Sequence, residues 1–289
     1  MPLIENRPTL SLEKVMYAAD FSPISDCAGR YAKGLAQRFG SKVQIAHVFP
    51  CYEDLTSDAV KADQRVRRQQ LIERQHEFSA AGIETQNVNS SEYPVPSALL
   101  LIETQFRPDM IIIGTHSKST FDRLLIGSTA EHLIRNAQSP VLTVGPKVKP
   151  PADGPVTFER IVFASDFSDS SIVAGGVALG FAQEYGAHLW ICHIVGDRPS
   201  SQTPSSAHAN DFQKELERRV PREAYDWCRP ECTVDYGSPA KGILRLAERV
   251  HADLIVMGAR TPSYWLTHLH RGVTQEVLAQ AGCPVVTVR

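Results

Sequence analysis

A glycine-containing pattern in the first half of the chain is typical of a loop that binds phosphate. Gly114 directly follows the apolar run Met110–Ile113, and the triplet Gly127–Thr129 opens an amphipathic stretch after an intervening loop. A glycine lets backbone N–H groups approach an anion closely. Hydroxyl side chains at a helix N-terminus add donors where the helix dipole favours negative charge. Lys118 and Arg123, inside the loop, add positive charge.

Asp20 is the second residue with suitable chemistry. It follows the apolar run Val15–Ala19, and a carboxylate at a strand end is a natural acceptor for ribose hydroxyls. The same residue type is also a common N-cap, so Asp20 can instead begin the next helix. In a parallel sheet the carboxyl ends of the strands share one edge, so Asp20 and Gly114 are expected at the same edge. Their joint placement there favours a ligand pocket.

Other chemical signatures are weak. Cys228 and Cys232, with His268 and His270 further on, lack a second matched pair, so no metal site is predicted. The chain contains no Walker A lysine motif, nucleophile elbow or HExxH motif. No catalytic residue is therefore predicted.

The elements that must position these residues alternate between short apolar runs and amphipathic stretches. Runs that are apolar at every position indicate parallel strands covered by helices on both faces. Ser22 and Ser168 are predicted N-caps, and Gly40 and Gly186 are predicted helix stops. The expected strands of the first half are Val15–Ala19, Val43–Val48, Ile83–Val88, Met110–Ile113 and Val141–Val144, and the expected helices are Ile24–Phe39, Ala59–Ala80, Ser97–Phe106 and Thr129–Ala137.

The chain contains this unit twice. Residues 16–22 (MYAADFS) return as 162–168 (VFASDFS) at a spacing of 146 residues, and RPDMIIIG (107–114) returns as HADLIVMG (251–258) at a spacing of 144. A period this long indicates duplicated domains. We expect a first domain over 1–148, a Pro- and Gly-rich linker over 149–158 and a second domain over 159–289. Each is predicted to be a doubly wound α/β domain.

Composition excludes several classes of protein. A net charge of −2 gives no electrostatic reason to expect nucleic acid as a partner. No run of about 20 apolar residues is present, and the first residues lack the apolar stretch of a signal peptide, so no membrane association is expected. Six scattered cysteines do not form a disulfide framework. These features favour a cytoplasmic protein.

The combined motifs resemble the universal stress protein family in its tandem, two-domain form. The resemblance rests on a strand followed by Asp-Phe-Ser, a strand ending in His-Val, a strand followed by the glycine loop, and the closing Pro-Val-x-x-Val. It covers nearly the whole chain and implies two five-stranded parallel sheets of order 3-2-1-4-5. Nucleotide-binding members hold adenosine near the aspartate and the phosphates at the glycine loop. Carried over, this implies an ATP, ADP or AMP site, with Mg²⁺ as a candidate companion, at Ala18, Asp20, His47, Ile113, Gly114, Ser117, Gly127, Ser128 and Thr129.

Two departures affect the implied site. Ser117 replaces the second glycine of the family's Gly-x-x-Gly, which adds a Cβ where backbone approach is needed. In the second repeat Asp166 and Gly258 persist, but Arg271 stands at the matched position of Gly127. The second phosphate loop is therefore predicted to be degenerate. His47, as a lone histidine beside a strand, is also compatible with a purely structural role.

The sequence is compatible with three functions. The first is a non-enzymatic module that binds an adenine nucleotide in stress response or signalling. The second is a nucleotide-free scaffold of the same family that dimerises and contacts partners. The third is a slow ATPase or nucleotidyl enzyme in which His116 orients water. The family also implies that the closing strands SPVLTV and CPVVTV pair as an internal pseudo-dimer, and a homodimer of two chains is a further possibility.

Overall fold

The computed structural model describes residues 10–49, 57–91, 94–115, 126–196, 206–259 and 272–289. The chain divides into two compact units. The first unit is Ser11–Val156, and the second is Thr157–Arg289 together with Leu10 at the start of the described chain. Each unit is an α/β domain built on one parallel sheet.

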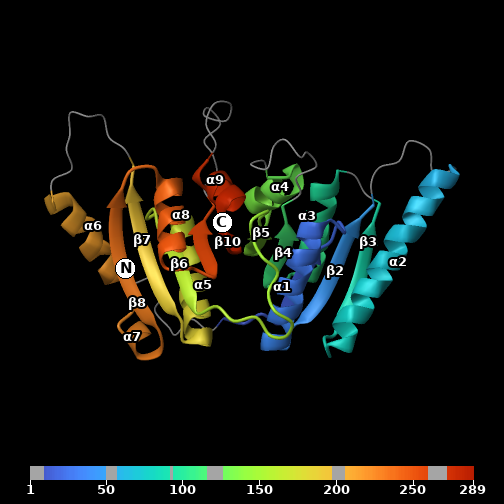
Figure 1. Ribbon diagram of the computed structural model, residues 1–289, viewed down its shortest axis with the longest axis horizontal. Coiled ribbons are helices and arrows are strands. Elements are labelled where there is room, and N and C mark those ends of the chain that lie inside the picture. Colours follow the sequence, from blue (N-terminus) through green and yellow to red (C-terminus); the bar gives the residue numbers. More distant parts are fainter. Residues whose placement is uncertain (1–9, 50–56, 92–93, 116–125, 197–205, 260–271) are drawn as a thin grey trace. The chain divides into compact units, whose positions relative to one another are not determined.

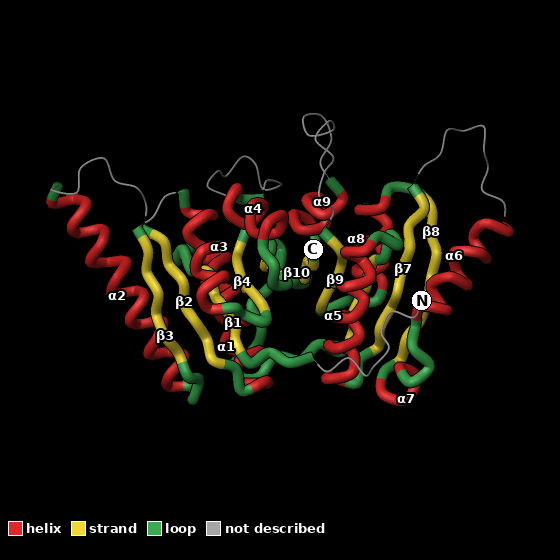
Figure 2. Tube along the Cα trace, turned by 180° about the vertical axis from the view of Figure 1, so that it is seen from behind, coloured by secondary structure: helices red, strands yellow, loops and turns green. Residues whose placement is uncertain are grey.

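The sheet of the first unit has the strand order β3-β2-β1-β4-β5. All of its pairings are parallel, as predicted. Helices α1 and α2 lie on one face of this sheet, and α3 and α4 lie on the other (Figures 1 and 2). The elements are β1 Lys14–Ala18, α1 Pro23–Phe39, β2 Lys42–Val48, α2 Asp58–Ala80, β3 Thr85–Ser90, α3 Val95–Phe106, β4 Met110–Gly114, α4 Ser128–Asn136 and β5 Val141–Val144.

The termini of α1 follow from local chemistry. Ser22 is the N-cap, and its Oγ accepts the N–H of Ser25 at 3.2 Å. Gly40 ends the helix in the left-handed conformation at φ 68°, which glycine adopts without steric cost. Both positions were predicted from the sequence and are confirmed.

Strand β3 differs from its predicted range of Ile83–Val88. Ile83 is buried, but it belongs to the turn after α2, where its N–H donates to the carbonyl of Phe78 at 3.1 Å. The strand begins at Thr85 and pairs with β2 as far as Ser90. It includes the polar residues Asn87 and Asn89 because pairing along β2, and not an apolar pattern, decides its extent.

Helix α2 is long but shallowly packed. Only Leu71 and Phe78 are buried among its 23 residues. Phe78 stacks against Tyr17 of β1 with ring centroids 6.2 Å apart, and the amide of Asn87 on β3 donates to Gln75 Oε1 at 2.7 Å. These contacts belong to its C-terminal half, so most of the helix surface faces solvent or polar neighbours.

The second unit repeats the design with the strand order β10-β9-β6-β7-β8. Relative to its own first strand, β6, this is again the predicted order. Ser168 caps α5 through the N–H of Ser171, and Gly186 ends it in the left-handed conformation. The elements are β6 Arg160–Ala164, α5 Asp169–Tyr185, β7 His188–Val195, α6 Ser206–Arg219, α7 Ala224–Trp227, β8 Arg229–Tyr236, α8 Pro239–Arg249, β9 Leu254–Gly258, α9 Val273–Gln280 and β10 Val285–Val288.

A membrane-spanning helix would need a long, apolar segment. Within the described ranges no helix has both the length and the apolar character to cross a bilayer.

Candidate functional site

The predicted site lies at the carboxyl ends of β1 and β4. These strands are direct neighbours, with Ala18 opposite Ile113 in the register. The sheet order reverses here, since β2 follows β1 on one side and β4 lies on the other. This is the switch point at which doubly wound sheets bind ligands.

Asp20 forms a tight turn between β1 and α1. Its Oδ1 accepts the N–H of Ser22 at 2.9 Å, and its own N–H donates to Ser25 Oγ at 3.2 Å. Phe21, between them, has φ 61°, which is a left-handed conformation unusual for a residue with a side chain. Of the two roles considered for Asp20, the N-cap role belongs to Ser22, and Asp20 orients the turn. Its carboxylate is exposed at the sheet edge.

The second unit has the same turn. Asp166 Oδ1 accepts the N–H of Ser168 at 3.0 Å, and Phe167 has φ 63°. A left-handed non-glycine residue costs on the order of 1–2 kcal/mol, so the surrounding contacts must hold it. Because both units keep this turn, it is part of the scaffold and does not by itself mark a ligand.

Gly114 is constrained by packing. A Cβ at this position would lie 2.8 Å from the backbone nitrogen of Ser25 and 2.9 Å from the carbonyl carbon of Ile24. The first turn of α1 therefore rests directly on the end of β4. Gly258 meets Ser170 and Ser171 of α5 in the same way, at 2.8 Å. The sequence interpretation gave Gly114 a role toward a ligand, and the structure adds a role in helix packing.

The N-terminus of α4 carries the predicted phosphate donors. Gly127 is its N-cap, with Ser128 and Thr129 in the first turn, and α4 has no side-chain cap hydrogen bond among the described residues. The first N–H groups of a helix have no partners within it, so they are available to an anion. Glu131 brings a negative charge to this turn, but its carboxylate pairs with Arg135 at 2.6 Å. In Figure 1, α4 lies beside the upper ends of β4 and β5, where the strands terminate.

The corresponding helix of the second unit begins one residue later than the matched spacing predicts. Gly272 is the N-cap of α9, although Arg271 is the residue matched to Gly127. Counted from the two caps, Val273 stands where α4 has Ser128. The side chain of Gln275 accepts the N–H of Gly272 at 3.4 Å. The second unit thus keeps a glycine cap but has an apolar residue in place of the serine and a side chain folded back onto the cap.

His47, near the end of β2, is buried and has one ring nitrogen without a hydrogen-bond partner in the described structure. Its Nδ1 lies 2.7 Å from the carbonyl of Ala19, and since a carbonyl only accepts, Nδ1 carries the proton. Rings of Phe21 and Phe49 lie 4.7 and 5.0 Å from the imidazole. Its Nε2 is buried with no hydrogen-bond partner in the described structure. Burial lowers the pKa of His47, so the ring is neutral. His193 makes the matching bond to Ser165 at 2.8 Å.

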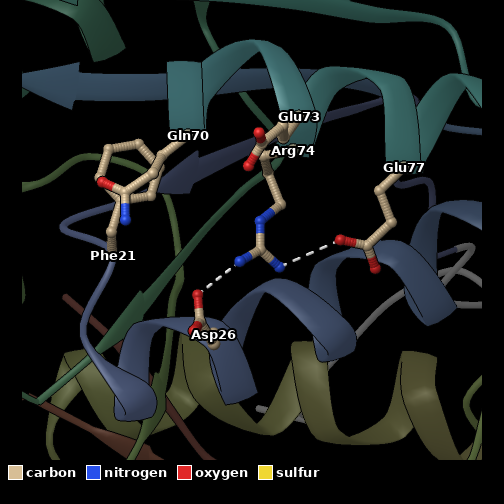
Figure 3. A pocket seen from close by; sticks show the side chains of 6 residues that line it. All are labelled: Phe21, Asp26, Gln70, Glu73, Arg74 and Glu77. Carbon is tan, nitrogen blue, oxygen red and sulfur yellow. Dashed lines mark hydrogen bonds and ion pairs between the residues drawn. The ribbon is translucent and has the colours of Figure 1, made fainter. Parts of the chain in front are cut away.

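A cavity of about 240 Å³ lies beside this edge, between α1 and α2 (Figure 3). The guanidinium of Arg74 points between two carboxylates, pairing with Asp26 and with Glu77, the latter at 3.2 Å. The lining of the cavity carries three carboxylates and one guanidinium, a balance of charge that disfavours an anion such as phosphate. Its lining consists of Phe21, Asp26, Gln70, Glu73, Arg74 and Glu77.

Part of the predicted site lies outside the described residues. Ser117 belongs to this part, as do His116, Lys118 and Arg123. The other predicted residues lie on the ends of β1, β2 and β4, in the turn after β1, or at the start of α4. Sequence reasoning missed Phe21 and Ser25, which hold the turn. The repeated Asp-Phe-Ser motif was their only signal.

Nothing in the described structure supports metal or thiol chemistry. No group of three or more His, Cys, Asp or Glu that could hold a metal ion occurs in the described ranges. Burial raises the pKa of the Cys228 and Cys232 thiols to about 12, so both are protonated and unreactive.

Comparison with known proteins decides the family. The family model described as the universal stress protein family matches residues 11–145 and again 157–289. The chain belongs to the universal stress protein family. It carries two such domains in tandem, in agreement with the strand order of both sheets.

Relatives of both sizes are similar to this tandem universal stress protein. A universal stress protein of Mycolicibacterium smegmatis is 24% identical over 95% of this chain and 96% of its own. One of Thermus aquaticus is 33% identical over 46% of this chain and 99% of its own. The crystal structure of a universal stress protein from Archaeoglobus fulgidus covers 98% of both chains with a TM-score of 0.75 at 18% identity, which shows the shared fold.

Proposed function

We propose that the first unit binds ATP or a related adenine nucleotide and that the protein acts as a non-enzymatic, nucleotide-responsive module. The observation that carries this proposal is the start of α4, where a glycine cap and two hydroxyl residues follow the loop at the sheet's switch point. In this proposal the phosphates lie against the first-turn N–H groups of α4. The dipole of α4 and the hydroxyls of Ser128 and Thr129 stabilise their charge.

The nucleoside end of the ligand would lie near Asp20. The turn that fixes Phe21 also fixes the direction of the Asp20 carboxylate, which is exposed and can accept ribose hydroxyls. Ala18 and Ile113, at the ends of β1 and β4, would supply apolar contact and backbone groups. His47 is 2% exposed, so it would contribute mainly through its backbone and through apolar contact.

Mg²⁺, if present, would enter with the phosphates. The described residues offer it no carboxylate cluster, and Mg²⁺ typically binds through phosphate oxygens and water with few protein ligands. Among solved structures of the family, one is described as a universal stress protein in complex with cAMP.

The test uses a matched pair of glycine substitutions. Gly127→Glu places a carboxylate where phosphate would bind, and a negative charge at a helix N-terminus is compatible with the fold. Gly272→Glu makes the same change at the cap of α9. Isothermal titration with ATP should show at least a 100-fold loss of affinity for Gly127→Glu and no change for Gly272→Glu. Equal affinity of all three proteins, or loss in Gly272→Glu alone, would refute the assignment.

A nucleotide-free scaffold is the second candidate. It is favoured by the finding that the Asp20 turn and Gly114 have packing roles that recur in the second unit. Mass spectrometry of nucleotide released on heat denaturation separates the two functions. Purified protein with no bound nucleotide and no affinity for ATP at millimolar concentration would favour the scaffold.

A further inference from the structure

The segment that follows β5 runs along α1 of the first unit. The Cys27 thiol lies 3.8 Å from the carbonyl of Val148, and the hydroxyl of Tyr31 donates to the carbonyl of Lys149 at 3.2 Å. The N–H of Val156 donates to the carbonyl of Gly34 at 3.2 Å. Residues 27, 31 and 34 share one face of a helix, so this segment covers a continuous stripe of α1.

Gly34 is the point of closest approach. A Cβ there would lie 2.4 Å from Val156 Cγ2 and 2.9 Å from the carbonyl oxygen of Gly154. Because Gly34 has no side chain, the segment that follows β5 can pack directly against α1. By sequence, however, Val156 lies four residues before β6, the first strand of the second repeat.

The residue of the first repeat that is equivalent to Val156 packs on the helix of the second unit. Leu10 stands 146 residues before Val156, the spacing that relates the starts of the two repeats. A Cβ on Gly180 of α5 would lie 3.0 Å from Leu10 Cβ, and Gly180 is the residue 146 positions after Gly34. Leu10 groups with the second unit, although it precedes the first strand of the first repeat.

From these contacts we propose that the two repeats exchange their leading arms. A leading arm is the short segment that precedes the first strand of a repeat and ends at Leu10 in the first repeat and at Val156 in the second. Leu10, four residues before β1, completes the second unit by packing against Gly180. The segment that ends at Val156, four residues before β6, completes the first unit by packing against Gly34. The unit boundaries support this, because the chain changes unit after Leu10 and again after Val156, at equivalent positions of the repeat. Helices α1 and α5 thus each bind an arm that belongs, by sequence, to the other repeat.

Helix α5 is more apolar than α1, so the arm that packs on it removes more apolar surface from water. Where α1 has Asp26 and Lys33, α5 has Ile172 and Leu179. Val173 on the same helix is 54% exposed, whereas Leu179, next to the seat of Leu10, is 1% exposed. An apolar helix surface is stabilised by cover, since contact removes it from water. Leu10 supplies such cover at Gly180, the residue after Leu179.

Amide hydrogen exchange of the full chain, read on α1 and α5 peptides, tests the exchange of arms. Leu10→Ala should speed exchange in α5 about tenfold and leave α1 unchanged, whereas Val156→Ala should speed exchange in α1 and leave α5 unchanged. Gly180→Ala and Gly34→Ala perturb the same two contacts from the helix side, so they should reproduce the two patterns. All three tryptophans (Trp190, Trp227 and Trp265) lie in the second repeat, so the fluorescence unfolding midpoint should fall with Leu10→Ala and not with Val156→Ala.

The crossed pattern is the result that supports the proposal. It is overturned if Leu10→Ala loosens α1, if Val156→Ala loosens α5, if either variant loosens both helices, or if neither helix responds. The readout needs no nucleotide, so this test stands or falls independently of the proposed ligand.

Discussion

The two units keep the same turn after their first strand but differ at the start of their last helix. Asp20 and Asp166 make the same hydrogen bond, next to a phenylalanine in the left-handed conformation. In contrast, α4 begins with Gly-Ser-Thr, and α9 begins with Gly-Val-Thr and a glutamine folded onto its cap. Features that both units share are explained by packing. The difference at the last helix is therefore what can distinguish a nucleotide-binding unit from one that is purely structural.

The largest effect on stability expected from a single substitution concerns the shared glycines. Gly114→Ala and Gly258→Ala should each lower the free energy of unfolding of their own unit by about 2 kcal/mol, because the added Cβ overlaps helix backbone. Urea unfolding, followed by tryptophan fluorescence for the second unit and by hydrogen exchange for the first, measures both. If Gly114→Ala left stability unchanged and only weakened nucleotide binding, the packing role would be wrong.

A smaller effect should appear on acidification of the first unit. Because burial lowers the pKa of His47 in the folded protein, the unfolded chain takes up the proton first, at its ordinary pKa of about 6.5. Stability is therefore greatest above pH 6.5 and falls as the pH drops below it.

Hydrogen exchange in β2 above and below pH 6.5 measures this loss. His47→Asn keeps a donor for the Ala19 carbonyl and removes the titrating group, so it should flatten the pH dependence. The matched His193→Asn, in the second unit, should leave the pH dependence of β2 as it was. A slope that survives in His47→Asn would assign the titration to another group.

The smallest effect concerns how α2 is attached to α1. Arg74→Met removes the ion pairs with Asp26 and Glu77, which are partly exposed, so it should cost only about 0.5 kcal/mol. The second unit has Ile172 at the position of Asp26 and has no counterpart of this pair. Exchange in α2 should rise in Arg74→Met and, in the parent protein, with added salt. Arg135→Met, which removes an ion pair on α4, is the control and should leave α2 unchanged.

The fold could be predicted from sequence because it depends on local signals. Apolar runs such as Met110–Ile113 gave the central strands, and Ser22 and Gly40 gave the ends of α1. The duplication extended these signals to the second unit. The strand order came from the family resemblance and agrees with the structure.

Features set by long-range contact could not be predicted. The left-handed Phe21 depends on Ser25 and His47, and the packing of Gly114 depends on α1. The N-cap of α9 lies at Gly272 and not at Arg271, and aligning the two repeats by their spacing cannot show which residue begins the helix. The seating of Leu10 on Gly180 joins residues far apart in the chain, which no periodicity encodes.

The length of helix α2 can change, in evolution or in design, with little loss of stability. Its anchors, Leu71 and Phe78, both lie in the C-terminal half, so turns added or removed ahead of Leu71 leave the core untouched. The corresponding helix α6 has 14 residues where α2 has 23, within the same sheet order. The start of α2 is accordingly the place in the first unit where an inserted peptide or a fused domain should be accommodated best.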